Sequence, residues 1–352
     1  MMKKILITGG AGFIGVNAVE YFYKKGNDVT VYDNFSRAGT NENLTSLFTE
    51  LNTKKIKVVI GDIRKPDKKL VELVEKSDAV IHLAAQTAVT TSVTDPRLDF
   101  ESNAVGTFNV LEIIRKSTKK PLMLYSSTNK VYGECTNIEV VEKPTRYEFK
   151  THLHGIGEDN PLDFHSPYGC SKGSADQYIR DYSRIYGLKT VVFRQSCIYG
   201  QRQLGVEDQG WLAWLIIASI FDKPITIFGD GKQVRDMLHV SDLVGLYEVA
   251  IEKIDQCSGQ VYNIGGGYKN TISVWKELGL ILEKKLDKKI SVNYLDWRPG
   301  DQKVWCSDIS KAKKDFSWEP KMELEKGIDA QIEWTIKNRS LIDKVFGSMN
   351  KK

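Results

Sequence analysis

Short apolar runs alternate with amphipathic stretches through the first half of the chain. The runs are rich in β-branched residues, and each ends at a polar or glycine-containing turn, as buried strands do. We therefore expect strands at residues 5–8, 29–32, 58–60, 79–83, 122–126 and 190–193. Apolar residues at helical spacing predict helices at residues 13–25, 66–76, 103–116 and 166–186. This alternation predicts an α/β fold with a Rossmann-type, doubly wound parallel sheet.

After residue 200 the regular alternation is lost. A helix is expected at 210–222, a strand at 225–228 and a mixed pattern from 261 onward. We interpret residues 201–234 and 256–345 as a smaller, mixed α/β C-terminal lobe that closes over the carboxyl ends of the strands and binds the substrate. Residues 1–200 form the main domain, to which 235–255 return. The last dozen residues are predicted to be solvated, with 346–352 as a basic tail.

Composition and charge exclude several classes of protein. The chain is 41% hydrophobic and 27% charged, as is usual for soluble proteins, and its net charge of +5 is too scattered to favour nucleic acid. The five cysteines include no Cys-x-x-Cys pair, so we expect neither disulfides nor a metal site. The apolar run at 211–221 is too short to span a bilayer. No signal-peptide pattern precedes the first strand, so a cytoplasmic protein without a membrane partner is expected.

A glycine-rich turn between the first strand and the first helix indicates a dinucleotide site. Gly9, Gly12 and Gly15 are spaced as Gly-x-x-Gly-x-x-Gly. Such glycines permit a tight turn and let backbone N–H groups approach a diphosphate at a helix N-terminus. Asp33 ends the second strand, where a carboxylate accepts hydrogen bonds from ribose hydroxyls and repels a 2′-phosphate, which favours NAD over NADP. Arg37 nearby leaves NADP open.

Further positions support the same cofactor, although a glycine-rich turn alone is common. Asp62 follows the third strand, where it could reach the adenine amino group, and small residues at 83–86 let the backbone pass beneath the cofactor. The full set expected to bind NAD is Gly9, Gly12, Phe13, Ile14, Gly15, Asp33, Asn34, Asp62, Ile63, Leu83, Ala84, Ala85, Gln86, Asn103, Ser126, Tyr168 and Lys172.

Tyr168 and Lys172 lie four residues apart, on one face of a predicted helix. A phenol is a weak base at neutral pH, but an ammonium one turn away and a positive nicotinamide favour the phenolate. The segment Ser126-Ser127-Thr128 ends the strand predicted at 122–126. The Thr128 hydroxyl could hydrogen-bond the substrate oxygen from which Tyr168 removes the proton. A Tyr and a Lys four residues apart, without other motifs, are usually two surface residues of a helix. Together with the glycine loop the pair predicts hydride transfer, with Tyr168 removing the hydroxyl proton.

These motifs resemble the nucleotide-sugar branch of the extended short-chain dehydrogenase/reductase superfamily over nearly the whole chain. The resemblance rests on the glycine loop and on residues 82–85, 103–107, 166–172, 235–242, 262–265 and 298–301. It implies that Arg235 and Arg298 hold the diphosphate of a nucleotide sugar, for which a guanidinium fork is well shaped. It also implies pairing of subunits through the helix of Tyr178, Ile179 and Tyr182, hence a homodimer or homotetramer.

The residues after Thr128 discriminate between reactions. The 4,6-dehydratase branch has Asp-Glu there, because elimination needs an acid and a base, and the uronic-acid decarboxylases have a Glu. This chain has Asn129-Lys130. Reversible oxidation remains: a hydride leaves, the keto-sugar turns, and the hydride returns to the other face. Because the cofactor ends as it began, such an epimerase retains its NAD.

Residues 126–133, 162–173 and 208–211 are similar to the CDP-paratose 2-epimerase (CDP-tyvelose epimerase) family. The resemblance implies inversion of C2 in a CDP-linked sugar, with Thr128, Tyr168 and Lys172 catalytic. The residues expected to bind substrate are Thr128, Asn129, Cys197, Gln209, Trp211, Arg235, Arg298 and Asp301. Cys197 departs from the Asn or Ser of many relatives, so a buried structural cysteine is an equal alternative.

Two other functions stay open at this stage. The first is a 4-epimerase of a UDP- or GDP-sugar, or a 2-epimerase of another nucleotide-linked hexose, with the same catalytic core. The second is a catalytically silent NAD-binding regulator, which should have lost Tyr168, Lys172 or the two arginines. His165 could be a second acid/base, but a role at the helix start is preferred. His152 and His154 are expected to be solvated, and Trp214 to lie in a core.

Overall fold

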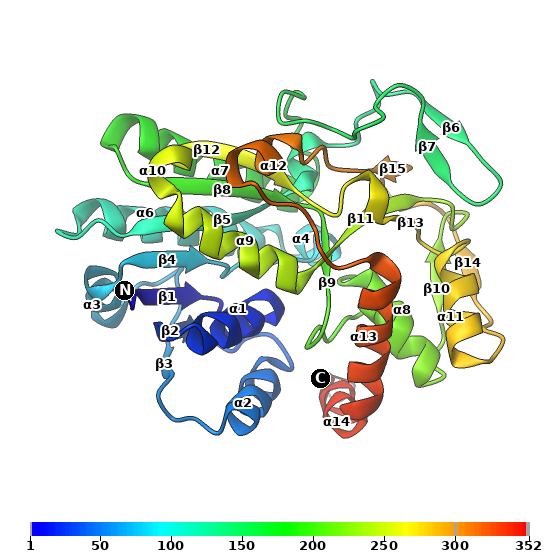
Figure 1. The fold of residues 1–352 in the computed structure, drawn as a ribbon, viewed down its shortest axis with the longest axis horizontal. Helices are drawn as coiled ribbons and strands as arrows, with labels where there is room; N and C mark the ends of the chain where they lie inside the picture. Colours follow the sequence, from blue (N-terminus) through cyan, green and yellow to red (C-terminus); the bar gives the residue numbers. More distant parts are fainter. Residues whose placement is uncertain (1, 299–300, 350–352) are drawn as a thin grey trace.

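The computed structural model describes residues 2–298 and 301–349. Its centre is a seven-stranded parallel sheet in the order β12-β8-β5-β4-β1-β2-β3 (Figure 1). The strands are β1 (Lys4–Thr8), β2 (Asp28–Asp33), β3 (Lys57–Ile60), β4 (Ala79–His82), β5 (Leu122–Thr128), β8 (Thr190–Gln195) and β12 (Gln260–Ile264). The six strands predicted in the first half are all present, and the Rossmann-type fold is confirmed.

Successive strand residues point to opposite faces of the sheet, and apolar residues occur on both faces. Helices therefore cover both faces. Ile5 and Ile7 of β1 pack into one core, and Leu6 packs into the other. The helices of the first core are α1 (Phe13–Lys24), α2 (Thr40–Leu51), α9 (Val240–Glu252), α10 (Ile254–Cys257) and α12 (Ser310–Phe316). Those of the second core are α3 (Lys68–Lys76), α6 (Gly106–Lys116) and α7 (Ser166–Tyr186). The fold is therefore a three-layer α/β/α sandwich.

The order of strands reverses at β1, which pairs with β2 on one side and β4 on the other. Crevices form at the carboxyl ends of parallel strands where the order reverses, and ligands of such sheets bind there. Three short helical segments follow β4: α4 (Val89–Thr94), α5 (Pro96–Phe100) and the π-helical turn η1 (Glu101–Val105), which leads into α6. The predicted helix at 103–116 thus begins in a π-helical turn.

The smaller lobe lies to the right of the sheet in Figure 1. Its core joins α8, α11, α13 and the lobe strands. The elements are β9 (Cys197–Tyr199), α8 (Trp211–Ile220), β10 (Thr226–Phe228), β11 (Val234–His239), β13 (Thr271–Ser273), α11 (Leu278–Leu286), β14 (Asn293–Leu295), β15 (Val304–Trp305), α13 (Leu324–Lys337) and α14 (Arg339–Met349). Two short 3₁₀ helices, η2 (Asn129–Tyr132) and η3 (Tyr268–Asn270), complete the chain together with a protruding hairpin formed by β6 (Val140–Glu142) and β7 (Tyr147–Phe149). No described helix is long and apolar enough to cross a membrane.

Two expectations about the C-terminal half need correction. Residues 260–264 were expected in the lobe, but they form β12, which pairs with β8 at the edge of the main sheet. The last dozen residues were expected to be solvated, but α14 runs to Met349, and Ile342, Val345 and Phe346 are buried beside Leu204 and Ile217. Both segments have apolar residues whose partners are distant in sequence, which local patterns do not reveal. Residues 350–352 of the expected tail lie outside the described residues.

Candidate active site

The glycine loop packs tightly between β1 and α1. Gly9 has φ +70°, and a Cβ there would lie 2.6 Å from the backbone nitrogen of Ala84 at the end of β4. A Cβ on Gly15 would collide with the carbonyl oxygen of Gly9. Gly12 is the N-cap residue of α1 and has no side chain to cap the helix. The backbone N–H groups of the first turn, including those of Phe13 and Ile14, therefore have no side-chain acceptor. An uncapped helix N-terminus behind a glycine turn fits a diphosphate group.

Asp33 ends β2 next to this loop. Its Oδ2 accepts a hydrogen bond from the backbone N–H of Ala11 at 3.0 Å, and its Oδ1 accepts one from Phe35 at 2.8 Å. Burial raises the pKa of this carboxyl, and the backbone hydrogen bonds oppose the rise. Each oxygen retains a free lone pair, so a ribose diol can bind. Arg37 turns away to donate to Thr87 at 3.0 Å.

Asp62 follows β3 at the same end of the sheet. Arg64 forms an ion pair with it at 2.6 Å, and Asn34 donates to it at 3.3 Å. These contacts lower the pKa of Asp62, chiefly through the Arg64 hydrogen bond. Ile63 is buried and packs beneath Gly106, where only a glycine leaves room. The structure thus brings Asp33, Asn34 and Asp62 to one edge of the sheet.

Asn103 lies behind the cofactor crevice and is 1% exposed. Its Oδ1 accepts from the backbone N–H of Gln86 at 2.8 Å, and its Nδ2 donates to Asp99 and Ser171, each at 3.0 Å. It therefore holds the loop after β4 against α7. Asp99 is a residue that the sequence analysis missed: it accepts hydrogen bonds from Ser171 at 2.5 Å and from Gln86 at 2.9 Å. No local signal distinguishes it from a surface aspartate of a short helix.

The three predicted catalytic residues meet where β5 ends beside α7. Thr128 lies beside the Tyr168 phenol and lowers its pKa, yet burial is the larger effect and raises the pKa of Tyr168 to about 12. Lys172 Nζ donates to the carbonyl oxygen of Ser126 at 2.5 Å and lies 4.2 Å above the Tyr125 ring. Burial lowers the pKa of Lys172 to about 7. In the protein alone, burial is therefore the largest influence on the pKa of the phenol.

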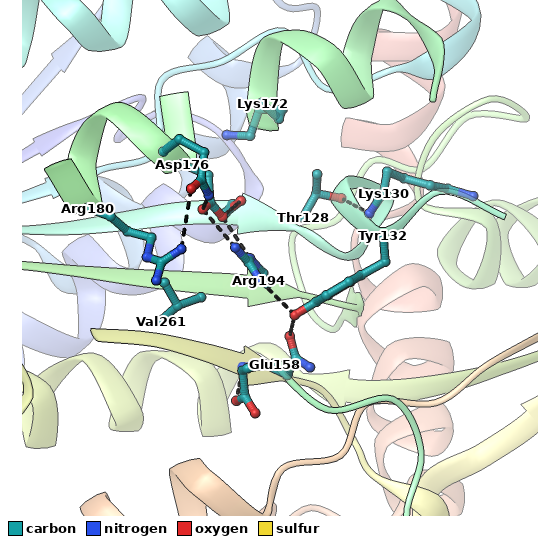
Figure 2. Close-up of polar contacts among 12 residues, drawn as sticks. Thr128, Lys130, Tyr132, Glu158, Lys172, Asp176, Arg180, Arg194 and Val261 are labelled. Atoms are coloured by element: carbon teal, nitrogen blue, oxygen red, sulfur yellow. Dashed lines mark hydrogen bonds and ion pairs between the residues drawn. The ribbon is translucent and has the colours of Figure 1, made fainter. Parts of the chain in front are cut away.

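A buried ion pair supports this centre from behind (Figure 2). Asp176, on the catalytic helix, accepts from Arg194 at 2.9 and 3.0 Å and from Ser127 at 2.8 Å. Arg194 also donates to the hydroxyl of Tyr132 at 2.8 Å, which in turn donates to Asn263 at 2.8 Å. The Arg194 and Asp176 side chains are 3% and 0% exposed. The network ties α7, β5, β8 and β12 together beside Thr128.

His82, at the end of β4, is fully buried between Thr8 at 2.6 Å and Thr107 at 3.0 Å. Burial and the nearby Lys172 ammonium lower the pKa of His82 to about 3. An unfolded imidazole titrates near ~6.5, so below that pH the unfolded state binds a proton that the folded state refuses. The free energy of unfolding should fall by about 1.4 kcal/mol per pH unit from pH 6.5 toward 3.

We therefore expect a His82→Gln variant to lose about 2 kcal/mol less stability between pH 7 and pH 5 than the parent chain does. Urea unfolding at both pH values measures this difference, and the comparison cancels the contributions of other titrating groups. Equal losses in the two proteins would show that His82 is not held neutral.

The substrate residues predicted from the sequence form two groups in the lobe. In the first, Arg235 of β11 pairs with Asp301 at 2.6 Å, and Trp211 Nε1 donates to Cys197 Sγ at 3.4 Å. Burial lowers the pKa of Lys130, as does the Arg235 guanidinium, so these two cations lie near each other, with Cys197 and Asp301 close by.

In the second group, Arg298 pairs with Asp208 at 3.0 Å and lies over the Phe228 ring at 3.8 Å. Gln209 donates to Thr87. Asn129 lies outside both groups, directly after β5, where it accepts from Thr128 at 3.4 Å. The sequence analysis used Lys130 only to argue against elimination and missed its place in the first group. Its position directly after Thr128 and Asn129 was the available signal.

The remaining candidates take no part in this site. His165 does not cap α7, and its Nε2 lies 3.6 Å from Glu134 at the surface. His152 and His154 are exposed, and no cluster of three or more metal-binding side chains occurs among the described residues. Trp214 packs against Phe346, 6.0 Å between ring centroids, as expected for a core residue.

Comparisons with known proteins agree with this geometry. The GDP-mannose 4,6 dehydratase family profile matches residues 6–331. CDP-paratose 2-epimerase of Salmonella typhi is 42% identical over 339 residues, which cover 94% of this chain and 99% of that protein. The chain belongs to the CDP-paratose 2-epimerase family. Among solved structures, UDP-glucuronic acid 4-epimerase from Bacillus cereus, in complex with UDP-glucuronic acid and NAD, matches with TM-score 0.81 and 30% identity over 95% of this chain and 99% of that one.

A dTDP-glucose 4,6-dehydratase from Streptomyces venezuelae with NAD bound matches with TM-score 0.81 and 25% identity, covering 97% of this chain and 99% of that one. The predicted superfamily, the CDP-paratose 2-epimerase family and the class of NAD-dependent nucleotide-sugar enzymes are thereby confirmed.

Proposed function

We propose that this chain is an NAD-dependent epimerase that converts CDP-paratose to CDP-tyvelose by inverting C2. The observation that carries the proposal is the catalytic end of β5, where Thr128 lies beside the Tyr168 phenol and is followed by Asn129 and Lys130 instead of carboxylates. Elimination of water needs an acid and a base at the sugar, whereas epimerisation needs only a reversible oxidation. The 42% identical relative carries the name of this reaction.

In this proposal NAD is bound by the glycine loop, Asp33, Asn34, Asp62, Ile63, residues 83–86, Ser126, Tyr168 and Lys172. Asn103 positions the loop after β4. The bound nicotinamide supplies a hydride acceptor and a positive charge near the phenol. Tyr168 takes the C2 hydroxyl proton, with Thr128 holding the same oxygen, and later returns it. Lys172, fixed by the Ser126 carbonyl, keeps a cation beside the proton-transfer site.

The lobe residues would hold the nucleotide sugar. Arg235 and Arg298 take the diphosphate, since each is a guanidinium with unused N–H donors. Asp301, Gln209, Trp211, Cys197 and Asn129 complete the substrate site. We assign the segments that build or cover the main sheet, residues 1–195 with α9, α10, β12 and α12, to the NAD-binding domain, and the lobe elements from β9 to α14 to the substrate lobe. Cys197 favours one second candidate, epimerisation of another CDP-, UDP- or GDP-linked hexose, because it alters the sugar-facing wall.

The test is to incubate the purified protein, without added cofactor, with CDP-paratose and to follow the sugar protons by NMR. An anomeric signal with the coupling of the C2 epimer supports the reaction and a retained NAD. No conversion, even after NAD is added, would overturn the assignment of substrate. CDP-glucose and then UDP- and GDP-hexoses would be tried next.

An Asp33→Ala variant is expected to retain NAD about 10- to 100-fold more weakly, because two charge-assisted hydrogen bonds to the ribose are lost. Cofactor content after purification and titration with NAD measure the change. Asp28→Ala, an exposed carboxylate at the start of the same strand, is the matched control. Unaltered NAD content in Asp33→Ala would contradict the assignment.

A Lys130→Met variant is expected to raise KM for the nucleotide sugar about tenfold with little change in kcat, because a cation beside Arg235 is lost from the substrate site. Steady-state kinetics test this, and Lys143→Met, an exposed lysine of the β6–β7 turn, is the control. A fall in kcat with KM unchanged would instead place Lys130 in the chemical step.

We further propose a homodimer or homotetramer assembled through α6 and α7 and a cytoplasmic location. Phe108, Tyr178 and Ile185 are exposed on these two helices, and Phe108 and Tyr178 form one aromatic pair at 5.8 Å. An apolar helix pair of this kind suits a two-fold four-helix contact. All five cysteines are free, which suits a reducing compartment.

A further inference from the structure

The far side of the catalytic helix holds a cavity that the proposed reaction does not use. It has a volume of about 500 Å³ and lies between the second half of α7, the start of β12 and the first turn of α12. Its wall includes Arg180 and Arg184 of α7, Arg194 of β8 and Lys311 of α12. Arg180 follows Lys172 by eight residues, about 12 Å along the helix axis, so this cavity is separate from the catalytic centre.

Four cations and two carboxylates line this wall, and the charge of Asp315 acts on Lys311 from outside the lining. Arg194 is already matched by Asp176. Within residues 2–298 and 301–349, neither Arg180, Arg184 nor Lys311 forms an ion pair. The acids that face them are Glu158, whose carboxylate accepts from Asn263 at 2.7 Å, and the exposed Asp159. Burial lowers the pKa of Arg180, and its neighbours Arg184 and Arg194 lower it further, which reports mutual repulsion.

The wall also presents N–H donors that lack acceptors. The Nε of Arg180 is buried without a hydrogen-bond partner, and its Nη1 reaches only Gln177 Oε1 at 3.3 Å. Figure 2 shows Arg180 lying beside Val261, with Arg194 to its right and Glu158 below. Lys311 Nζ donates to the carbonyl oxygen of Val261 at 2.8 Å and to Gln260 at 3.0 Å, which leaves it one N–H.

We propose that this cavity is a second anion site, which binds the phosphate group of a small molecule. A dianionic phosphate supplies acceptors for the unused N–H groups of Arg180, Arg184 and Lys311, the cations of the lining that form no ion pair with the described residues. Guanidinium groups match phosphate oxygens in geometry, and two of them line this wall with a lysine. The volume exceeds that of inorganic phosphate, so a phosphorylated small molecule also fits. The exposed Arg184 and Asp159 at its rim leave a way in from solvent.

The experiment compares thermal unfolding in inorganic phosphate with that in chloride at equal ionic strength and pH. A ligand that binds only the folded state raises Tm, and we expect a rise of about 2 °C or more for the parent chain in saturating phosphate. Arg180→Gln and Lys311→Gln should each lose most of this rise. Lys313→Gln, on the same helix but exposed and paired with Glu319, should keep it.

An Arg235→Gln variant separates this cavity from the diphosphate site, since phosphate bound there would depend on Arg235. The proposal is overturned if Arg180→Gln and Lys311→Gln keep the full rise, or if Arg235→Gln abolishes it. The same series is repeated with CMP in the Arg235→Gln background to identify the natural source of the phosphate group. A larger rise in Tm with CMP than with inorganic phosphate identifies a nucleotide. An equal rise in Tm identifies free phosphate. Epimerase activity is not read out, so failure here leaves the proposed reaction untouched.

Discussion

Replacing Tyr168 by phenylalanine is expected to lower the turnover of CDP-paratose by about 10²- to 10⁴-fold, the usual contribution of a positioned acid/base group. The phenol lies beside Thr128, and among the described residues no hydrogen bond joins it to another acid/base side chain. The variant should retain NAD, because Asp33 and the glycine loop lie apart from the phenol. Conversion followed by NMR and the cofactor content after purification measure the two effects separately.

The matched control is Tyr178→Phe, which removes a phenol 50% exposed on the same helix and should leave turnover unchanged. Full activity in Tyr168→Phe would refute the mechanism. The high pKa of Tyr168, about 12 here, further predicts that turnover of the parent chain rises from neutral toward alkaline pH as long as the fold persists.

Replacing Arg194 by methionine is expected to destabilise the fold by about 3–5 kcal/mol, the largest stability effect we predict. The reason is that Asp176 keeps its charge in a site with no exposure and has only neutral donors left. Burial opposes the charge on Arg194, yet the Asp176 contacts more than offset this and keep the pKa of Arg194 above its usual value. Chemical denaturation measures the loss.

The paired variant Asp176→Leu with Arg194→Met removes both charges and should recover a large part of that loss. If it is no more stable than Arg194→Met alone, the cost comes from lost packing and not from an unpaired buried charge. Lys189→Met, which breaks the exposed pair with Asp255, is the control and should cost under about 1 kcal/mol.

Local patterns were sufficient for every strand of the main sheet except β12, and for much of the site. Strands and turns alternate with a clear period, and the glycine loop and the Tyr168–Lys172 pair are each contained in one short segment. Parallel strands then bring those segments together, since their carboxyl ends meet at one edge. The positions of Asp33, Thr128, Tyr168 and Lys172 could therefore be predicted without knowledge of tertiary contacts.

Contacts between distant segments could not be predicted in this way. Asp99, Asp176 and Arg194 read as ordinary charged residues, and only the packed structure shows that they are buried partners. The burial that raises the pKa of Tyr168 is a tertiary property, which the local sequence around the phenol does not show. The burial of α14 depends on Leu204 and Ile217, more than a hundred residues earlier.

The placement of β12 has a consequence for how new specificities can arise in this family. The chain leaves the main sheet for the lobe after β8, returns for α9 and β12, leaves again at β13, returns for α12 and leaves once more for α13. The lobe is therefore a discontinuous domain, formed by several separate segments of the chain. Recombination between relatives would have to exchange several separate fragments to transplant a substrate pocket. Preference for a new sugar should therefore evolve by point substitutions at positions such as Lys130 and Cys197.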